Sequence, residues 1–138
     1  MVEEIEKQKK TLSIMLFTGP YGSQDADHMC RIAKRAIDKG YLVQIFLYGD
    51  GVHAQMTGQA PKMFFNIGEA LNQLVAAGAV IKSCVRCSTA RGYIDGEFNE
   101  SLDRYPSKKA LDAVKIYSLY GFIDMIKTGD KLITFGSS

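Results

Sequence analysis

The sequence has few of the features that mark membrane, secreted or nucleic-acid-binding proteins. It contains no apolar run near the roughly 20 residues that span a bilayer, and its first ten residues are too charged for a signal peptide. A net charge of +2 without a basic stripe gives no support for binding nucleic acid or a membrane. Three cysteines are too few for a disulfide framework, and an odd number is typical of reduced thiols. We therefore expect a soluble cytoplasmic protein.

The composition is that of an ordinary globular domain. The chain has 138 residues, of which 46% are hydrophobic and 23% charged. This length is close to the commonest domain size, which predicts one domain with one core. We expect a charged N-terminal extension over residues 1–11, to which we assign no function, and a single domain over residues 12–138.

Short apolar runs alternate with amphipathic segments along the chain. Strands are predicted at residues 12–18, 41–48, 80–85, 113–117 and 131–135, and helices at about residues 25–39, 65–77 and 119–127. Near-continuous apolar runs are typical of parallel strands buried on both faces. The pattern predicts an α/β fold, a three-layer α/β/α domain with a mainly parallel sheet of four or five strands and flavodoxin-like layering. Ligands bind at the carboxyl edge of such sheets.

The segment at residues 79–93 carries the strongest candidate chemistry. Cys84 and Cys87 come at the end of the third predicted strand, and Arg86 and Arg91 lie beside them. A thiol at a strand-to-helix boundary, surrounded by positive charge, can be exposed and have a lowered pKa, which makes it a nucleophile. We therefore predict that Cys84 is an exposed, reactive thiol. Cys87 is either buried or a second, resolving thiol.

The Cys-x-x-Cys spacing by itself leaves several interpretations open. As a metal motif it is half a zinc site, and only Cys30, His28 and His53 remain as further ligands, so we expect no metal. As a dithiol redox pair the spacing is suitable, but no Trp precedes it and no Pro lies within it, unlike thioredoxin. A third interpretation gives Cys84 alone the chemistry, as a thiolate that accepts and hands on sulfur. The remaining one is a pair of buried structural thiols.

Four other side chains are candidates for the same edge of the sheet. Arg86 and Arg91 could stabilise a thiolate or persulfide, or bind an anionic tail of a partner, although either could be an ordinary surface arginine. His53, in the loop after the second strand, could exchange protons with the thiol or simply be solvated. Tyr48, at the end of that strand, could line the site or be an ordinary strand-end aromatic residue.

The turn Gly19-Pro20-Tyr21-Gly22 follows the first predicted strand and precedes a helix, as phosphate-binding loops do. It lacks both the Lys-Ser/Thr pair of a P-loop and the three-glycine spacing of dinucleotide-binding loops. We expect Tyr21 to shape the wall of a pocket. A non-catalytic module that binds a nucleotide or another small anion remains an alternative function for this sheet edge.

Three segments of the chain resemble the DsrE/TusD (DsrE/DsrF-like) family of sulfur-relay proteins. They are the Thr-Gly-Pro-Tyr-Gly turn within residues 16–24, the Tyr-Gly-Asp-Gly-Val segment within residues 46–52, and the cysteine followed by Ala-Arg-Gly within residues 84–92. The resemblance runs from the first predicted strand to the last. The cysteine at the end of the third strand, with the Ala-Arg-Gly turn after it, is its most specific part.

The resemblance implies a function and a reactive residue. In this family the equivalent of Cys84 carries a persulfide, which it receives from a sulfur donor and passes to a partner's cysteine. The family implies the same α/β/α fold, no organic or metal cofactor, and a role in sulfur oxidation, sulfur trafficking or tRNA thiolation. It also implies DsrC/TusE-like or TusA-like carriers as partners, and a homotrimer, homohexamer or hetero-oligomer with related subunits. Contact with membrane or direct contact with nucleic acid is not expected.

Cys87 departs from the family pattern, because that position is commonly a small apolar residue. A second thiol there could release bound sulfur as hydrosulfide by forming a Cys84–Cys87 disulfide, or could tune the lifetime of the persulfide. A dithiol oxidoreductase that uses both cysteines is therefore the main alternative to a sulfur carrier. The apolar residues at 63–65 could form a subunit contact or belong to the core.

Overall fold

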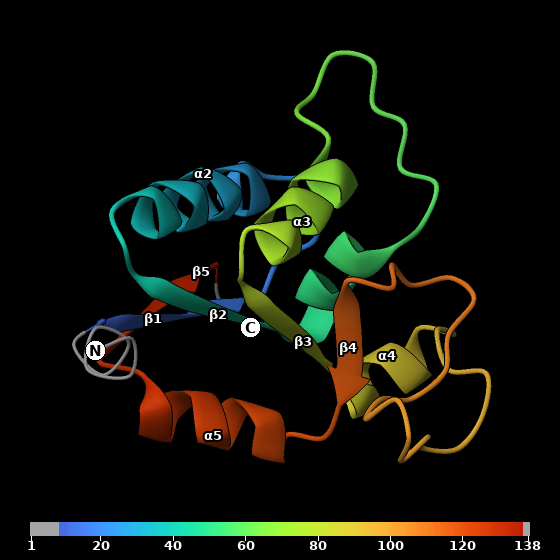
Figure 1. Cartoon of the computed structure of the whole chain (residues 1–138). Coiled ribbons are helices and arrows are strands. Elements are labelled where there is room, and N and C mark those ends of the chain that lie inside the picture. Colours follow the sequence, from blue (N-terminus) through green and yellow to red (C-terminus); the bar gives the residue numbers. More distant parts are fainter. Residues whose placement is uncertain (1–8, 137–138) are drawn as a thin grey trace.

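The computed structural model describes residues 9–136, which form one five-stranded parallel sheet with helices on both faces (Figure 1). The strands are β1 (Thr11–Leu16), β2 (Leu42–Leu47), β3 (Val80–Cys84), β4 (Val114–Tyr117) and β5 (Lys131–Phe135), in the order β4-β3-β2-β1-β5. The helices are α2 (Asp25–Asp38), the 3-10 helix η1 (Gly49–Gln55), α3 (Ile67–Ala76), α4 (Val85–Ala90) and α5 (Tyr120–Thr128). The predicted α/β/α fold is confirmed, and all the strand pairs are parallel.

The two faces of the sheet are covered unequally. Helices α2 and α3 pack together on one face, whereas α5 crosses β1 and β2 on the other (Figure 1). Successive side chains of a strand point to opposite faces, so Ile14 and Ile45 join the larger core under α2 and α3, and Met15 and Phe46 face α5. The alternation of side chains within each strand therefore decides which of the two cores each side chain joins.

Local signals explain where the helices begin and end. The Ser23 hydroxyl accepts a hydrogen bond from the Asp25 N–H at the start of α2, and the Asn66 side chain caps α3 by accepting from the Glu69 N–H. Because Asn66 is the cap, α3 begins two residues later than predicted. Gly40, after α2, has a φ of 94°, which glycine adopts without strain.

The carboxyl ends of the strands lead directly into the segments that form the candidate site. The Tyr21 turn follows β1, η1 follows β2, and α4 continues from β3 without a break. Gly51 is needed for this arrangement, because a Cβ there would lie 2.1 Å from the backbone oxygen of Leu16. Its missing side chain lets η1 lie directly on the end of β1.

Two predictions concern the N-terminal extension and the loop before α3. The extension predicted at residues 1–11 falls mostly outside the described residues, and Thr11 already belongs to β1, where it pairs with Leu42. The apolar residues at 63–65 are not core, because Met63 is 91% exposed and Phe64 is 64% exposed. Within residues 9–136, no helix is long and apolar enough to cross a membrane.

Candidate functional site

Cys84 is the last residue of β3 and lies inside the smaller of the two cores. Its backbone pairs with Tyr117 of β4, and the alternation within β3 turns its side chain toward the face that α5 covers. The residue is only 3% exposed. Its buried cluster contains Met15, Phe46 and Met125, with Phe17, Tyr48, Cys87 and Phe122 packed against it. The prediction that Cys84 is exposed is wrong, because its side chain belongs to the buried cluster between the sheet and α5.

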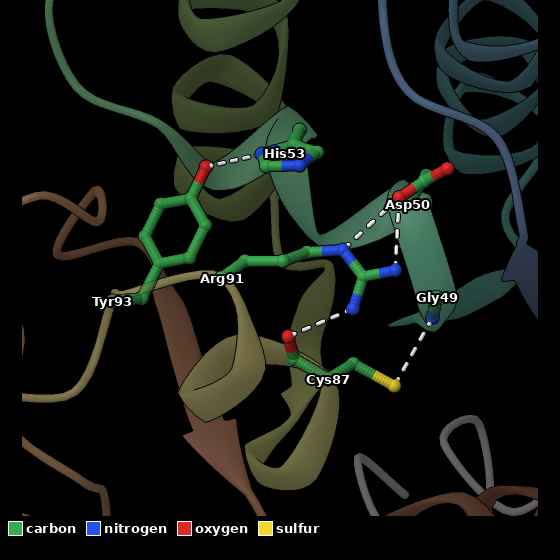
Figure 2. A network of polar contacts seen from close by, with 6 residues as sticks. All are labelled: Gly49, Asp50, His53, Cys87, Arg91 and Tyr93. Atoms are coloured by element: carbon green, nitrogen blue, oxygen red, sulfur yellow. Dashed lines mark hydrogen bonds and ion pairs between the residues drawn. The ribbon is translucent and has the colours of Figure 1, made fainter.

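Cys87 is the more accessible of the two thiols. It is the third residue of α4, three positions after Cys84, and its side chain packs against the buried cluster that contains Cys84. Its side chain is partly exposed. The backbone N–H of Gly49 donates a hydrogen bond to the Cys87 sulfur across 3.2 Å (Figure 2). The first residue of η1 therefore contacts the thiol that α4 carries, at the carboxyl edge of the sheet.

The protonation of Cys87 is governed by opposing effects. Burial raises the pKa of the Cys87 thiol above its ordinary value, and this effect is larger than the lowering by the Gly49 N–H. The neighbouring Cys84 raises the pKa further, and the Arg91 guanidinium lowers it. The arginines beside Cys87 were expected to lower its pKa, but the opposing effect of desolvation is larger. The thiol is the predominant form at neutral pH, and the thiolate is a minor, reactive form.

Arg91 connects α4 to the loop after β2. Its Nη2 and Nε atoms contact Asp50 Oδ1 at 2.8 and 3.0 Å, and its Nη1 donates to the backbone oxygen of Cys87 at 3.0 Å (Figure 2). Because an exposed ion pair contributes little to stability, its main effect here is to position the guanidinium beside the thiol. Arg86, in contrast, is exposed on α4, and the arginine that affects the Cys87 pKa is Arg91.

His53 belongs to the same edge but contacts a tyrosine. Its Nδ1 lies 2.8 Å from the hydroxyl of Tyr93 (Figure 2). The Tyr93 residue is only 4% exposed. Burial raises the pKa of the Tyr93 hydroxyl, which therefore stays protonated at neutral pH. The pair joins η1 to the residues that follow α4, and so fixes the two segments that surround Cys87.

Tyr48 and Tyr21 have different positions relative to the thiols. Tyr48 packs edge-on against Phe17, with ring centroids 5.9 Å apart, and belongs to the cluster around Cys84. The Tyr21 hydroxyl instead donates to Gln59 Oε1 at 2.7 Å and accepts from the Ile67 N–H at 3.2 Å. Tyr21, with a φ of 72°, thus supports the loop before α3. Its role in shaping the wall of a pocket stays a prediction.

Three contributors to the site were not singled out from the sequence. Gly49 binds a thiol through its backbone, Asp50 holds Arg91, and Tyr93 holds His53. The glycine turn at the end of the second predicted strand was a partial signal, because it places residues 49–51 at the same sheet edge as the cysteines. A backbone N–H leaves no pattern in the side chains, so its contact with sulfur could only be found in three dimensions.

Two thiols, a backbone donor and a guanidinium meet at this edge of the sheet. Of these groups, the Gly49 N–H and the Arg91 guanidinium stabilise an anion on Cys87, because both lower its pKa, whereas the Cys84 thiol raises it. A cleft of about 440 Å³ lies at the same edge and is lined by residues that include Thr18, Gly19, Asp50 and His53. No group of three or more His, Cys, Asp or Glu side chains that could hold a metal ion is found within residues 9–136.

Known proteins resemble this chain over most of its length. An uncharacterized protein of Methanopyrus kandleri is 30% identical over 124 residues, covering 90% of this chain and 93% of its own length. The YchN protein of Escherichia coli is 30% identical over 118 residues, covering 84% of this chain and 91% of its own length. The crystal structure of YchN superposes with a TM-score of 0.76 at 25% identity, covering 93% of this chain and all of YchN.

A structure from Bacteroides thetaiotaomicron, of a conserved protein of unknown function, has the same fold, with a TM-score of 0.59 at 14% identity. It covers 91% of this chain and 95% of its own. The profile of the DsrE/DsrF-like family matches residues 10–135, from the start of β1 to the end of β5. With the five-stranded sheet and the thiols at its carboxyl edge, this match shows that the chain belongs to the DsrE/DsrF-like family.

Proposed function

We propose that the protein is a sulfur carrier that holds sulfane sulfur as a persulfide on Cys84 and passes it to a cysteine of a partner protein. The observation that carries the proposal is the pair of neighbouring thiols, Cys84 and Cys87, which share one packed cluster at the carboxyl edge of β3. Membership of the DsrE/DsrF-like family suggests a role related to sulfur relay. The site has the groups that such a role requires.

Each step of the proposed reaction is an exchange at sulfur. The Cys84 thiolate attacks the outer sulfur of a donor persulfide, the bond between that sulfur and the donor breaks, and the donor leaves as a thiolate. With a thiosulfonate donor the leaving group is a sulfinate. A partner thiolate then attacks the outer sulfur on Cys84 and restores the Cys84 thiolate. No electrons are gained or lost overall, because the sulfur changes only its carrier.

The surroundings of the thiols suit a persulfide. The buried cluster of Met15, Phe46 and Met125 around Cys84 keeps water away from the sulfur, and exchange with unwanted thiols requires access that burial denies. The Gly49 N–H and the Arg91 guanidinium can stabilise negative charge that develops on sulfur at the open side. We assign Arg86, which is exposed on α4, to contact with the partner.

A dithiol oxidoreductase is the second candidate, because the same adjacency would allow a Cys84–Cys87 disulfide. In that reaction the two thiols lose two electrons and two protons to an oxidised substrate. The two candidates differ in what remains on the protein. A carrier gains sulfur atoms, whereas an oxidoreductase gains a cross-link.

The proposed partners are carrier proteins that present a reactive cysteine, and the proposed setting is the cytoplasm. Family membership suggests sulfur-relay partners in general. The exposed residues Met63 and Phe64, in the loop before α3, are our candidates for contact between subunits of a homotrimer or homohexamer.

Mass spectrometry of the protein after incubation with polysulfide or a thiosulfonate, without reductant, tests the proposal. A gain of sulfur on the Cys84 peptide that is absent in Cys84→Ser is the expected result. A loss of two hydrogens with a Cys84–Cys87 cross-link, and no sulfur gain, would favour the oxidoreductase. If neither cysteine changes, titration with nucleotides and flavins tests the alternative of an anion-binding module.

A further inference from the structure

The two thiols differ in solvent accessibility, and this difference decides which of them an external sulfur donor can reach. Cys84 is 3% exposed and shares a buried cluster with Met15, Phe46 and Met125. Cys87 is partly exposed and sits between η1 and α4. A donor whose sulfur is attached to a peptide or protein needs to bring that sulfur within bonding distance of the attacking thiolate. In this chain Cys87 meets that requirement and Cys84 does not.

We infer that Cys87 is the entry and exit thiol of a two-step relay, in which sulfur is first accepted at the surface by Cys87 and then moved inward to Cys84 for storage. The inference rests on the proposed sulfur-carrier function and names the residue that exchanges sulfur with the outside. It replaces direct attack of Cys84 on the donor by attack of Cys87, followed by a transfer within the protein. The stored species is unchanged.

The internal step balances without a co-reactant. The persulfide on Cys87 carries a proton on its outer sulfur, and the Cys84 thiolate attacks that sulfur. The bond from Cys84 to the sulfur forms, the bond from Cys87 to the sulfur breaks, and its electron pair stays on Cys87 as a thiolate. One persulfide and one thiolate are present before and after the step, so nothing is oxidised or reduced.

The contacts around Cys87 fit its role as the leaving group of the internal step. The thiolate that forms there receives the N–H of Gly49, which already donates to this sulfur at 3.2 Å. The guanidinium of Arg91 is held beside it by Asp50 and by the backbone oxygen of Cys87. These two groups lower the pKa of Cys87 against the opposing effect of burial, and a thiol of lower pKa leaves faster, so they favour transfer away from Cys87 toward Cys84. In reverse, the same path returns the sulfur to the surface.

The sequence permits a direct test, because trypsin cleaves after Lys82, Arg86 and Arg91. The two thiols then lie on separate peptides, residues 83–86 and residues 87–91. The protein is mixed with glutathione persulfide, samples are alkylated at successive times with an excess of iodoacetamide, and the sulfur content of each peptide is followed. In the wild type, we expect sulfur on the Cys87 peptide first and on the Cys84 peptide afterwards.

Three variants separate the steps. In Cys84→Ser, sulfur should remain on Cys87, because there is no inner acceptor. In Cys87→Ser, loading of Cys84 should slow by about tenfold or more, since access limits sulfur exchange. Cys30→Ala is the matched control: it removes a buried thiol of α2 that lies apart from this site, and it should load both cysteines as the wild type does.

The outcomes distinguish the relay from the underlying function. If Cys84 gains sulfur first, or gains it at the wild-type rate in Cys87→Ser, the relay is wrong while the carrier function stands. If Cys84 gains no sulfur in the wild type, the carrier function itself fails. If Cys87→Ser does not fold, as judged by circular dichroism, the order of labelling in the wild type and the result with Cys87→Ala still decide.

Discussion

Removal of the Phe122 ring should uncover Cys84 and convert it into a directly reactive thiol. Phe122 lies on α5, and its ring packs on that of Phe46 with centroids 5.4 Å apart. Both residues belong to the cluster that encloses Cys84. The burial of this cysteine thus depends on a helix that lies far from it in the sequence, and Phe122→Ala tests that dependence.

The cost of the substitution follows from the burial of the ring. Truncation of a fully buried Phe to Ala costs about 3–5 kcal/mol. Phe122 is only partly buried, so we expect a loss of about 2 kcal/mol, which includes its pairing with Phe46. For a domain of this size, that loss lowers the melting temperature by roughly 8 °C.

The assay is alkylation of the native protein by iodoacetamide, followed by digestion with trypsin. The peptides of residues 83–86 and 87–91 report on Cys84 and Cys87 separately, and that of residues 11–31 reports on the buried Cys30. In the wild type Cys87 should react well before Cys84. In Phe122→Ala the alkylation of Cys84 should become about tenfold faster or more, because access governs thiol reactivity.

The controls separate local exposure from unfolding. Ile123→Ala changes a neighbouring residue of α5 that is 39% exposed, and it should alter stability by less than about 0.5 kcal/mol and leave Cys84 unreactive. Cys30 should stay unreactive in every variant unless the whole chain opens. The reasoning fails if Phe122→Ala destabilises the protein as expected while Cys84 remains as slow as in the wild type.

Three further predictions concern the turn after β2, the buried thiol of α2 and the arginine of the site. Gly51→Ala should lower the free energy of unfolding by about 3 kcal/mol or prevent folding, because the added Cβ would lie 2.1 Å from a backbone oxygen of β1. Urea unfolding measures this loss. The control Gly22→Ala, whose Cβ would meet no atom within 4 Å, should unfold as the wild type does. Burial raises the pKa of Cys30 from 9.0 to about 12. Above pH 9.0 the unfolded chain loses the Cys30 proton while the folded chain keeps it, so the free energy of unfolding falls as pH rises, by about 2 kcal/mol at about pH 10.5. Unfolding of Cys30→Ala at the same pH values should lack this part of the loss. Equal losses in the wild type and in Cys30→Ala would contradict the assignment. Arg91→Gln should raise the pKa of Cys87 further and slow its alkylation at neutral pH but not at strongly alkaline pH, so a slowing that persists at high pH would point to lost access instead.

The sheet and its functional edge were predictable because their signals are local. Near-continuous apolar runs predicted the strands, and glycines and helix periodicity between them predicted parallel pairing. In parallel strands all carboxyl ends meet at one edge, so the cysteines at the end of the third strand were expected near the turn at residues 49–51. The contact of Gly49 with Cys87 agrees with this expectation. The family resemblance pointed to Cys84 alone, through the cysteine at the end of the third strand and the Ala-Arg-Gly turn after it.

The accessibility of each thiol was decided only by the tertiary structure. Lys82 and Cys84 share a face of β3, and the exposure of Cys84 was predicted from its place at a strand end beside arginines. In the structure, Lys82 extends over the ring of Tyr117, while α5 returns after β4 and covers Cys84. Burial depends on a contact between segments separated by some tens of residues along the chain, and nothing in the local pattern at 79–93 encodes it. The sequence by itself therefore determined the α/β fold and the position of both cysteines at the end of β3, whereas the tertiary packing decided which thiol meets the solvent.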